Sequence, residues 1–257
     1  MKLLKRIQKK LDAEKRRANK RRIIRDGLKA IAPDLVVKHG PFKGMKYSEA
    51  KSVGSSFLPK LIGSYEAELH PTIEVVCQNN YSDIIDIGCA EGYYAVGLAM
   101  RFPDAKIHAF DTDEEAIRLC QEMAALNGVD RERFLIGDFC DTQKLLNISI
   151  QGKGLIICDC EGYEKELFTP RAAEKLAQHD LIIETHDCFD IEISTYLYNI
   201  FIKTHDIEVI QSIDDIQKAK TYQYDEIAGY DLATKKVLLM EDRASIMEWF
   251  FVKSRAA

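Results

Sequence analysis

The chain has 257 residues, of which 46% are hydrophobic and 30% charged, with a formal net charge of -5. This composition is ordinary for a soluble globular protein and leaves room for one large domain or two small ones. No run reaches the roughly 18 apolar residues that span a bilayer, and the charged N-terminus lacks the apolar stretch of a secretory signal. The seven cysteines are odd in number and form no Cys-x-x-Cys pair. We therefore expect reduced thiols and a cytoplasmic protein, rather than disulfides or a zinc site.

The charge is concentrated at the N-terminus. Residues 1–30 hold 13 of the 36 Lys and Arg but only three of the 41 Asp and Glu, so they carry +10 and the remainder carries -15. We expect a basic helix over 2–30, and a division between a basic arm with its linker (1–45) and a main domain (46–257). The arm could be a solvated helix that aids solubility, touch an anionic surface, or pack on another subunit of a homo-oligomer.

Apolar runs and amphipathic segments alternate along the rest of the chain. After a helical segment at 56–79, which Gly63 and Pro71 could divide, the pattern predicts strands at 83–88, 106–111, 132–136, 154–159 and 180–185. Helices are predicted between them at 91–101, 113–127, 163–178 and 190–203. Two last strands, at 207–213 and 246–253, have no helix of similar weight between them and suit an antiparallel edge. The expected fold is α/β: a doubly wound, Rossmann-like, mostly parallel seven-stranded sheet with helices on both faces, an antiparallel closing strand and the N-terminal basic helix.

A glycine turn joins the first predicted strand to its helix, in the run Asp86-Ile87-Gly88-Cys89-Ala90-Glu91-Gly92. Glycine has no Cβ, so a ligand can approach this backbone closely, at the strand end where open α/β sheets bind cofactors. A dinucleotide favours G-x-G-x-x-G, but Ala90 and Tyr93 hold the second and third glycine positions here. This crowding disfavours a pyrophosphate and indicates a smaller ligand without phosphate.

An aspartate lies at the end of each of the next two predicted strands. Asp111 lies 23 residues after Gly88, where an acid can accept hydrogen bonds from both ribose hydroxyls. Asp138 could meet an adenine amine. The alternatives are a helix N-cap for Asp111 and a turn residue for Asp138. An adenosine without phosphates, held by a glycine turn and these acids, indicates S-adenosylmethionine.

Residues 83–138 resemble a class I S-adenosylmethionine-dependent methyltransferase, through Asp86-x-Gly88-x-x-x-Gly92 and Ala109-Phe110-Asp111, with Ala90 in place of the usual middle glycine. Further on, Asp159-x-Glu161-Gly162-x-Glu164 resembles the signature of the FkbM family of O-methyltransferases, and 182–186 its following strand. The resemblance covers about residues 60–205. It implies methyl transfer to a hydroxyl on a sugar or another small polar metabolite.

The expected cofactor contacts come from the glycine turn, the strand-end acids and a segment that could fold over the methionine part of the cofactor. They are Asp86, Gly88, Cys89, Ala90, Glu91, Gly92, Tyr93, Asp111, Thr112, Asp138, Phe139, Asp159, Tyr65 and Glu66. Arg243 and Trp249 could line the acceptor side, although ordinary packing explains them equally well.

The expected catalytic residues lie at or just past the ends of the fourth and fifth strands: Asp159, Glu161, Glu184 and His186. An alcohol must lose its proton, and His186 is the leading base because histidine titrates near neutrality. A loop histidine without a role is the alternative, as is a turn or N-cap role for Glu161. The same four residues could also hold a divalent metal, although their spacing is not diagnostic.

Two other functions remain open. A nucleic-acid methyltransferase could be guided by residues 1–30, although the main domain is acidic and no Asn-Pro-Pro-Tyr-type motif occurs. A non-catalytic scaffold could dock a membrane or a partner through the basic helix. The glycine turn and Asp111 argue against the scaffold.

Overall fold

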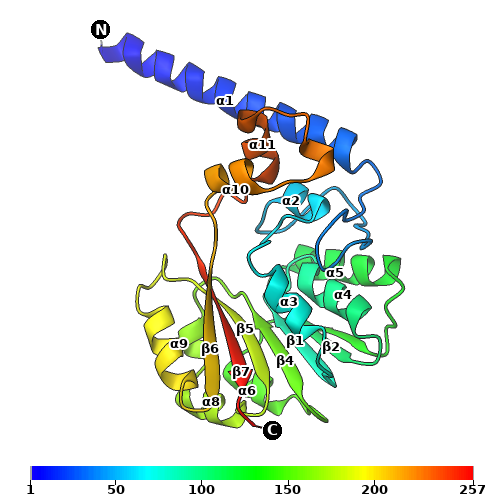
Figure 1. Cartoon of the computed structure of the whole chain (residues 1–257). Helices are drawn as coiled ribbons and strands as arrows, with labels where there is room; N and C mark the ends of the chain where they lie inside the picture. Colours follow the sequence, from blue (N-terminus) through cyan, green and yellow to red (C-terminus); the bar gives the residue numbers. More distant parts are fainter. Residues whose placement is uncertain (1, 257) are drawn as a thin grey trace.

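The structure is a computed structural model that describes residues 2–256, with the side chains of all of these except residues 2–5 and 7. Within this range seven strands form one sheet (Figure 1). Their spatial order is β3 (Phe134–Gly137), β2 (Lys106–Phe110), β1 (Asp83–Ile87), β4 (Gly154–Cys158), β5 (Asp180–Thr185), β7 (Glu248–Ser254) and β6 (His205–Gln211). The first five pair in parallel, and β7 is antiparallel to both of its neighbours. The predicted Rossmann-like sheet with its antiparallel closing strand is confirmed.

The central strands are buried along their whole length, and mostly apolar, because both faces of the sheet are covered. All residues of β1, β4 and β5 are buried. Successive side chains point to opposite faces, so Ile84 belongs to one core cluster and Ile85 to the other.

Helices cover each face of the sheet. Those on the face of Ile84 are α3 (His70–Val76), α4 (Tyr93–Arg101) and α5 (Glu114–Leu126), and those on the other face are α6 (Thr142–Asn147), α7 (Glu164–Leu167), α8 (Pro170–Lys175) and α9 (Ile193–Phe201). The helix predicted at 163–178 is in fact divided into α7 and α8. The division occurs because Thr169 caps α8 by accepting from the Ala172 amide, while Pro170, which has no N–H, starts the new helix.

A group of helices lies beyond one end of the sheet, and we call it the helical cap (Figure 1). It consists of α1 (Lys2–Ile31), α2 (Phe57–Ile62), α10 (Asp215–Thr221), the 3-10 turn Asp225–Ile227 and α11 (Leu232–Leu239). The last three lie between β6 and β7, so the expectation of no comparable helix there is wrong. Both α10 and α11 are short and begin at capping aspartates, Asp214 and Asp231, whose carboxylates accept from backbone amides.

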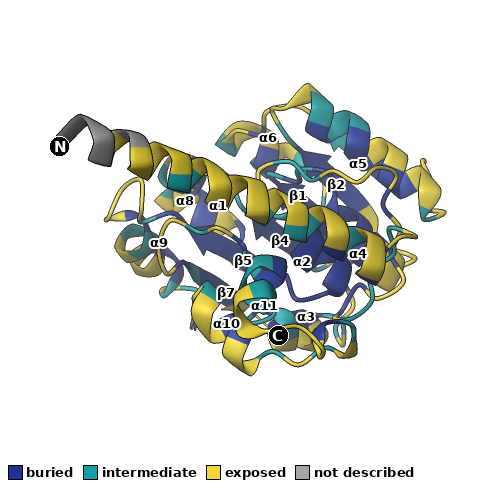
Figure 2. Ribbon diagram, turned by 90° about the horizontal axis from the view of Figure 1, so that it is seen from above, coloured by how far each residue is buried: buried dark blue, intermediate teal, exposed yellow. Residues whose placement is uncertain are grey.

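The basic helix α1 is present as predicted, and Figure 2 shows most of its described residues as exposed. Near its C-terminal end Gly27 packs so tightly that an added Cβ would lie 2.5 Å from Leu238 of α11. Lys20 forms an ion pair with Asp242 at 2.5 Å. The predicted division at residue 45, and a contact of α1 with an anionic surface or another subunit, stay predictions. The side chains of Phe42 and Met45 are buried in the main core.

All seven cysteines are free thiols. Among the helices of residues 2–256, none combines the length and the apolar character needed to cross a membrane.

Candidate active site

The glycine turn after β1 packs closely against the backbone that follows β4. Gly88 has φ +84°, and a Cβ there would lie 1.7 Å from the carbonyl oxygen of Asp159, so only glycine fits. The amides of Gly88 and Cys89 both donate to the Phe110 carbonyl, at 2.9 and 3.0 Å. The turn therefore lies directly between the ends of β2 and β4.

Asp111, just after β2, is tied to this turn. One carboxylate oxygen accepts from the Ala90 amide at 2.8 Å, and the other accepts from the Asp113 amide at 2.9 Å. Ala90 itself has φ +46°, which is uncommon for a residue other than glycine. The helix α5 is capped by Asp113 instead, which accepts from the Glu115 and Ala116 amides. Asp111 is thus not the N-cap of α5.

Asp86, in β1, is a buried carboxylate with one oxygen that lacks a hydrogen-bond partner among the described residues. It is 2% exposed, and its Oδ2 atom has no hydrogen-bond partner among the described residues. Burial, followed by repulsion from Asp159, raises the pKa of Asp86 to about 8. A carboxylate in this condition favours a positively charged group brought to it.

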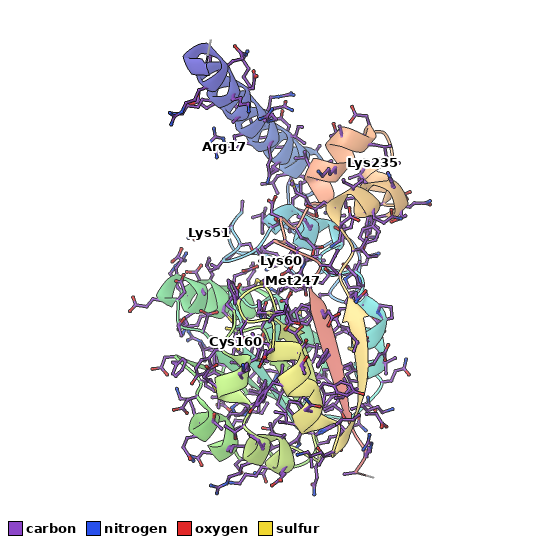
Figure 3. All side chains as sticks on the ribbon, turned by 90° about the vertical axis from the view of Figure 1, so that its left-hand side faces the viewer. Arg17, Lys51, Lys60, Cys160, Lys235 and Met247 are labelled. Carbon is purple, nitrogen blue, oxygen red and sulfur yellow. The ribbon has the colours of Figure 1, made fainter. Side chains whose placement is uncertain are left out.

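A cavity of about 470 Å³ lies at these strand ends, within the size range of small-molecule sites. Figure 3 shows Lys60 and Met247, which both line it, where the helical cap meets the sheet. The sequence-predicted residues that line the cavity are Tyr65, Asp86, Gly88, Cys89, Ala90, Tyr93, Asp111, Thr112, Phe139, Asp159, Glu161, Glu184, His186 and Arg243.

Other residues singled out in the sequence lie outside this lining. Glu91 is buried and binds the Lys60 ammonium at 2.6 Å, and it also accepts from the Val53 amide at 3.0 Å. Gly92 starts α4 behind the turn. The side chain of Asp138 is 82% exposed and pairs with Lys144. Trp249 is in the core.

A buried histidine and three acids meet at the ends of β4 and β5. His186 Nδ1 lies 2.7 Å from Glu164 Oε1, and its Nε2 lies 3.4 Å from Asp159 and 3.6 Å from Glu161. Burial opposes protonation of His186, but the Glu164 hydrogen bond and the nearby acids outweigh it and raise the pKa above its usual value. With Nδ1 bound by Glu164, Nε2 is the nitrogen available to a ligand.

Arg243, from the segment that leads into β7, holds three carboxylates at once. It donates to Glu66 at 2.6 Å, to Glu241 at 2.9 Å, and to Glu184. Burial and repulsion from Asp159 raise the pKa of Glu184, while Arg243 opposes the rise. Glu66 therefore faces Arg243 and Tyr94 rather than the cavity. The buried Lys218 binds Glu241 from the other side.

The metal alternative also has a geometric basis. Asp159, Glu184 and His186 each offer one ligand atom, and these atoms lie within 4.8 Å of one another. They could hold a divalent cation, but Arg243 already occupies one oxygen of Glu184.

Sequence reasoning missed several parts of the site, above all Lys60, Glu241, Lys218 and Phe189. A lysine inside the apolar run 57–62 was a usable signal for Lys60, because a buried charge needs a partner. Lys218 and Glu241 meet only through the tertiary fold.

Comparison with known proteins gives the family. A model described as "Methyltransferase domain" matches residues 79–245, which is more than half of the chain. The chain belongs to this methyltransferase family. The glycine turn and Asp111 predict membership of a methyltransferase family from the sequence, and the match confirms it.

Individual relatives cover less of the methyltransferase. The chain is 30% identical to ribosomal RNA large subunit methyltransferase G of Shewanella amazonensis over 97 residues. This matched stretch makes up 37% of the present chain and 24% of that protein. The chain is 36% identical over 62 residues to release factor glutamine methyltransferase of Deinococcus radiodurans, 24% of this chain and 22% of that protein. The chain thus spans about a quarter of the length of the curated relatives it matches. An rRNA methylase structure from Streptococcus thermophilus aligns with TM-score 0.48 and 13% identity, covering 73% of this chain and 96% of that one.

We expect Arg243→Gln to lower the free energy of unfolding of the methyltransferase by about 3–5 kcal/mol, because buried carboxylates lose their cation. The loss should shrink as pH falls below about 7, because burial raises the pKa of Glu66 to about 7 and raises that of Glu184, so that protonation neutralises both acids. Urea unfolding measures both effects. The control is Arg255→Gln, whose pair with Asp206 is exposed and should cost less than about 1 kcal/mol. Equal losses in the two variants would show that Arg243 does not neutralise the buried carboxylates.

We also expect Glu164→Gln to lower the pKa of His186, because Glu164 stabilises the charged imidazole. NMR titration of the His186 ring reads this directly. Glu166→Gln is the matched control, since Glu166 is an exposed acid of the same helix. An unchanged pKa in the Glu164 variant would show that the hydrogen bond does not control this histidine.

Proposed function

We propose that the enzyme transfers the methyl group of S-adenosylmethionine to a hydroxyl oxygen of a small polar acceptor, such as a sugar, in the cytoplasm. The observation that carries the proposal is His186, whose Nε2 faces the cavity beside Asp159 and Glu161 while Glu164 holds Nδ1. Bound S-adenosylmethionine supplies a methyl group that is already activated as a sulfonium. The protein's part is to align the acceptor, exclude water and remove the hydroxyl proton.

The chemistry of the residues at the glycine turn supports S-adenosylmethionine as the methyl donor. Asp86 has a buried oxygen without a partner, which suits the ammonium of the methionine part. The absence of a Cβ at Gly88 leaves the backbone accessible, and Asp111 at the end of β2 suits the two ribose hydroxyls. Thr112 and Phe139, both in the cavity lining, would flank the adenine.

The acceptor side rests on the cluster at β4 and β5. Neutral His186 would take the hydroxyl proton at Nε2, and Glu164 would stabilise the imidazolium that results. Asp159 and Glu161 lie close enough to His186 to orient the hydroxyl that it deprotonates. The likeness of Asp159–Glu164 and of the strand before His186 to FkbM O-methyltransferases supports the same assignment.

We expect Asp111→Ala to weaken S-adenosylmethionine binding by about tenfold to a hundredfold, because charge-assisted hydrogen bonds to the ribose are lost. Isothermal calorimetry gives the affinity. Asp104→Ala is the control, since Asp104 is an exposed acid just before the opposite end of β2. Unchanged affinity, or binding of NAD by the wild-type protein, would overturn the donor assignment.

We expect His186→Ala to reduce methyl transfer by about a hundredfold or more while the affinity for S-adenosylmethionine stays nearly constant. Transfer is followed with a radiolabelled methyl group and a panel of methyl glycosides, and affinity by calorimetry. If turnover and affinity fall equally, His186 is not the base.

A further inference from the structure

An ion pair is buried beside the glycine turn and takes no part in the proposed reaction. Glu91, within the turn, binds the ammonium of Lys60 in α2 at 2.6 Å, and the side chains of Glu91 and Lys60 are 1% and 3% exposed. Burial opposes the ionisation of Glu91, but Lys60 outweighs it and holds the pKa of Glu91 below its ordinary value. Ion pairs buried this deeply rarely add net stability, so stability alone does not account for this one.

The same carboxylate also holds the segment 48–55, which leads into α2. This segment makes no backbone–backbone hydrogen bond to any described residue. Instead, the Glu91 carboxylate accepts from the Val53 amide at 3.0 Å and from the Ser52 hydroxyl at 2.8 Å. Lys60 donates to the same hydroxyl at 3.1 Å. Three residues of the segment line the cavity together with the glycine turn, so Glu91 joins two parts of the cavity wall.

The segment 48–55 has weaker attachments at its outer side. Two exposed ion pairs connect it to α5, one of them between Lys51 and Glu115 at 2.6 Å, with side chains 46% and 39% exposed. Exposed pairs of this kind contribute little to stability. Figure 3 shows Lys51 at the edge of the molecule and Lys60 inside it. The buried pair is therefore the contact that fixes this segment beside the cavity.

We propose that Glu91 is a positioning residue of the donor site, which together with Lys60 fastens the segment 48–55 over bound S-adenosylmethionine. This inference rests on the proposed function, because it places the donor between this segment and the glycine turn. Glu91 itself needs no contact with the donor. It acts through the Val53 amide and the Ser52 hydroxyl that it binds.

The segment 48–55 is suited to open for the exchange of the donor. A stretch without backbone hydrogen bonds separates from the rest of the protein at a low cost in free energy. Its Gly54 is loosely surrounded, since an added Cβ there would meet no atom within 4 Å. The donor binds the fastened form. Loss of the anchor therefore lowers the populated fraction of that form and weakens the apparent affinity by the same factor.

The test removes both charges of the buried pair at once. Glu91→Leu combined with Lys60→Met leaves no buried charge unpaired, unlike either change alone. NMR-detected hydrogen exchange at the Val53 amide reports the release of the segment, and calorimetry gives the affinity for S-adenosylhomocysteine. We expect exchange at Val53 to become at least tenfold faster while the amides of β1 stay protected, and the affinity to fall by about tenfold. Lys51→Met, which removes an exposed pair of the same segment, is the control and should change neither.

A second variant covers the case in which the double variant does not fold. Ser52→Ala keeps the ion pair but removes one hydrogen bond to Glu91, so both measurements should move in the same direction by about threefold. It decides the question if the double variant also loses protection in β1. Unchanged exchange at Val53 overturns the proposal, and so does faster exchange with unchanged affinity. Failure of the wild-type protein to bind S-adenosylhomocysteine would instead refute the donor assignment, which is a different result from wild-type binding that the variants leave unchanged.

Discussion

The site depends on one buried cation, the guanidinium of Arg243. It binds Glu184 at the end of β5, Glu66 ahead of α3 and Glu241 in its own segment, and so joins the helical cap to the sheet. Burial of an ion pair rarely adds net stability, but removal of one partner leaves an uncompensated charge and is costly. This contact, together with the pairing of β7 on β5 that begins at Glu248, holds the cavity-lining segment 241–247 against β5.

Several carboxyl groups of the site are buried, and their burial lowers the stability of the folded protein. Burial raises the pKa of Asp86 to about 8, and burial raises that of Glu66 to about 7 against the opposing pull of Arg243. An acid with a raised folded-state pKa contributes stability below its unfolded pKa and loses it as pH rises toward the folded value. At neutral pH Asp86 and Glu66 are therefore partly protonated, and a cation brought beside Asp86 would favour its ionised form. These buried carboxyl groups lower the stability of the folded protein at the place where charged groups are needed for binding. Such a loss of stability is common at functional sites.

The parts of the structure that follow from local sequence were predictable. Buried isoleucine runs marked β1, β4 and β5. The glycine turn marked one edge of the cavity, because a strand, a left-handed turn and a helix start follow one another within a few consecutive residues. Long-range partners were not predictable. Glu91 lies within the glycine motif, yet its carboxylate faces Lys60, 31 residues away, and Asp138 faces Lys144 in solvent. The helices α10 and α11 were missed because they are short, so that their periodicity is weak and their capping aspartates are the clearest signal.

The two sides of the cavity also differ in how far their residues can be recognised from local sequence motifs. The proposed donor wall comes from three strand ends, each followed by a short motif that the sequence makes visible. The proposed acceptor wall combines the turn after β5 with a segment inserted between β6 and β7, and Lys20 of α1 pairs with Asp242 within that segment. The basic helix, whatever it contacts at its exposed end, is thereby joined to the wall that faces the acceptor. The proposed acceptor side therefore depends on the helical cap, and the proposed donor side depends on the glycine turn, Asp111 and the sheet that carries them.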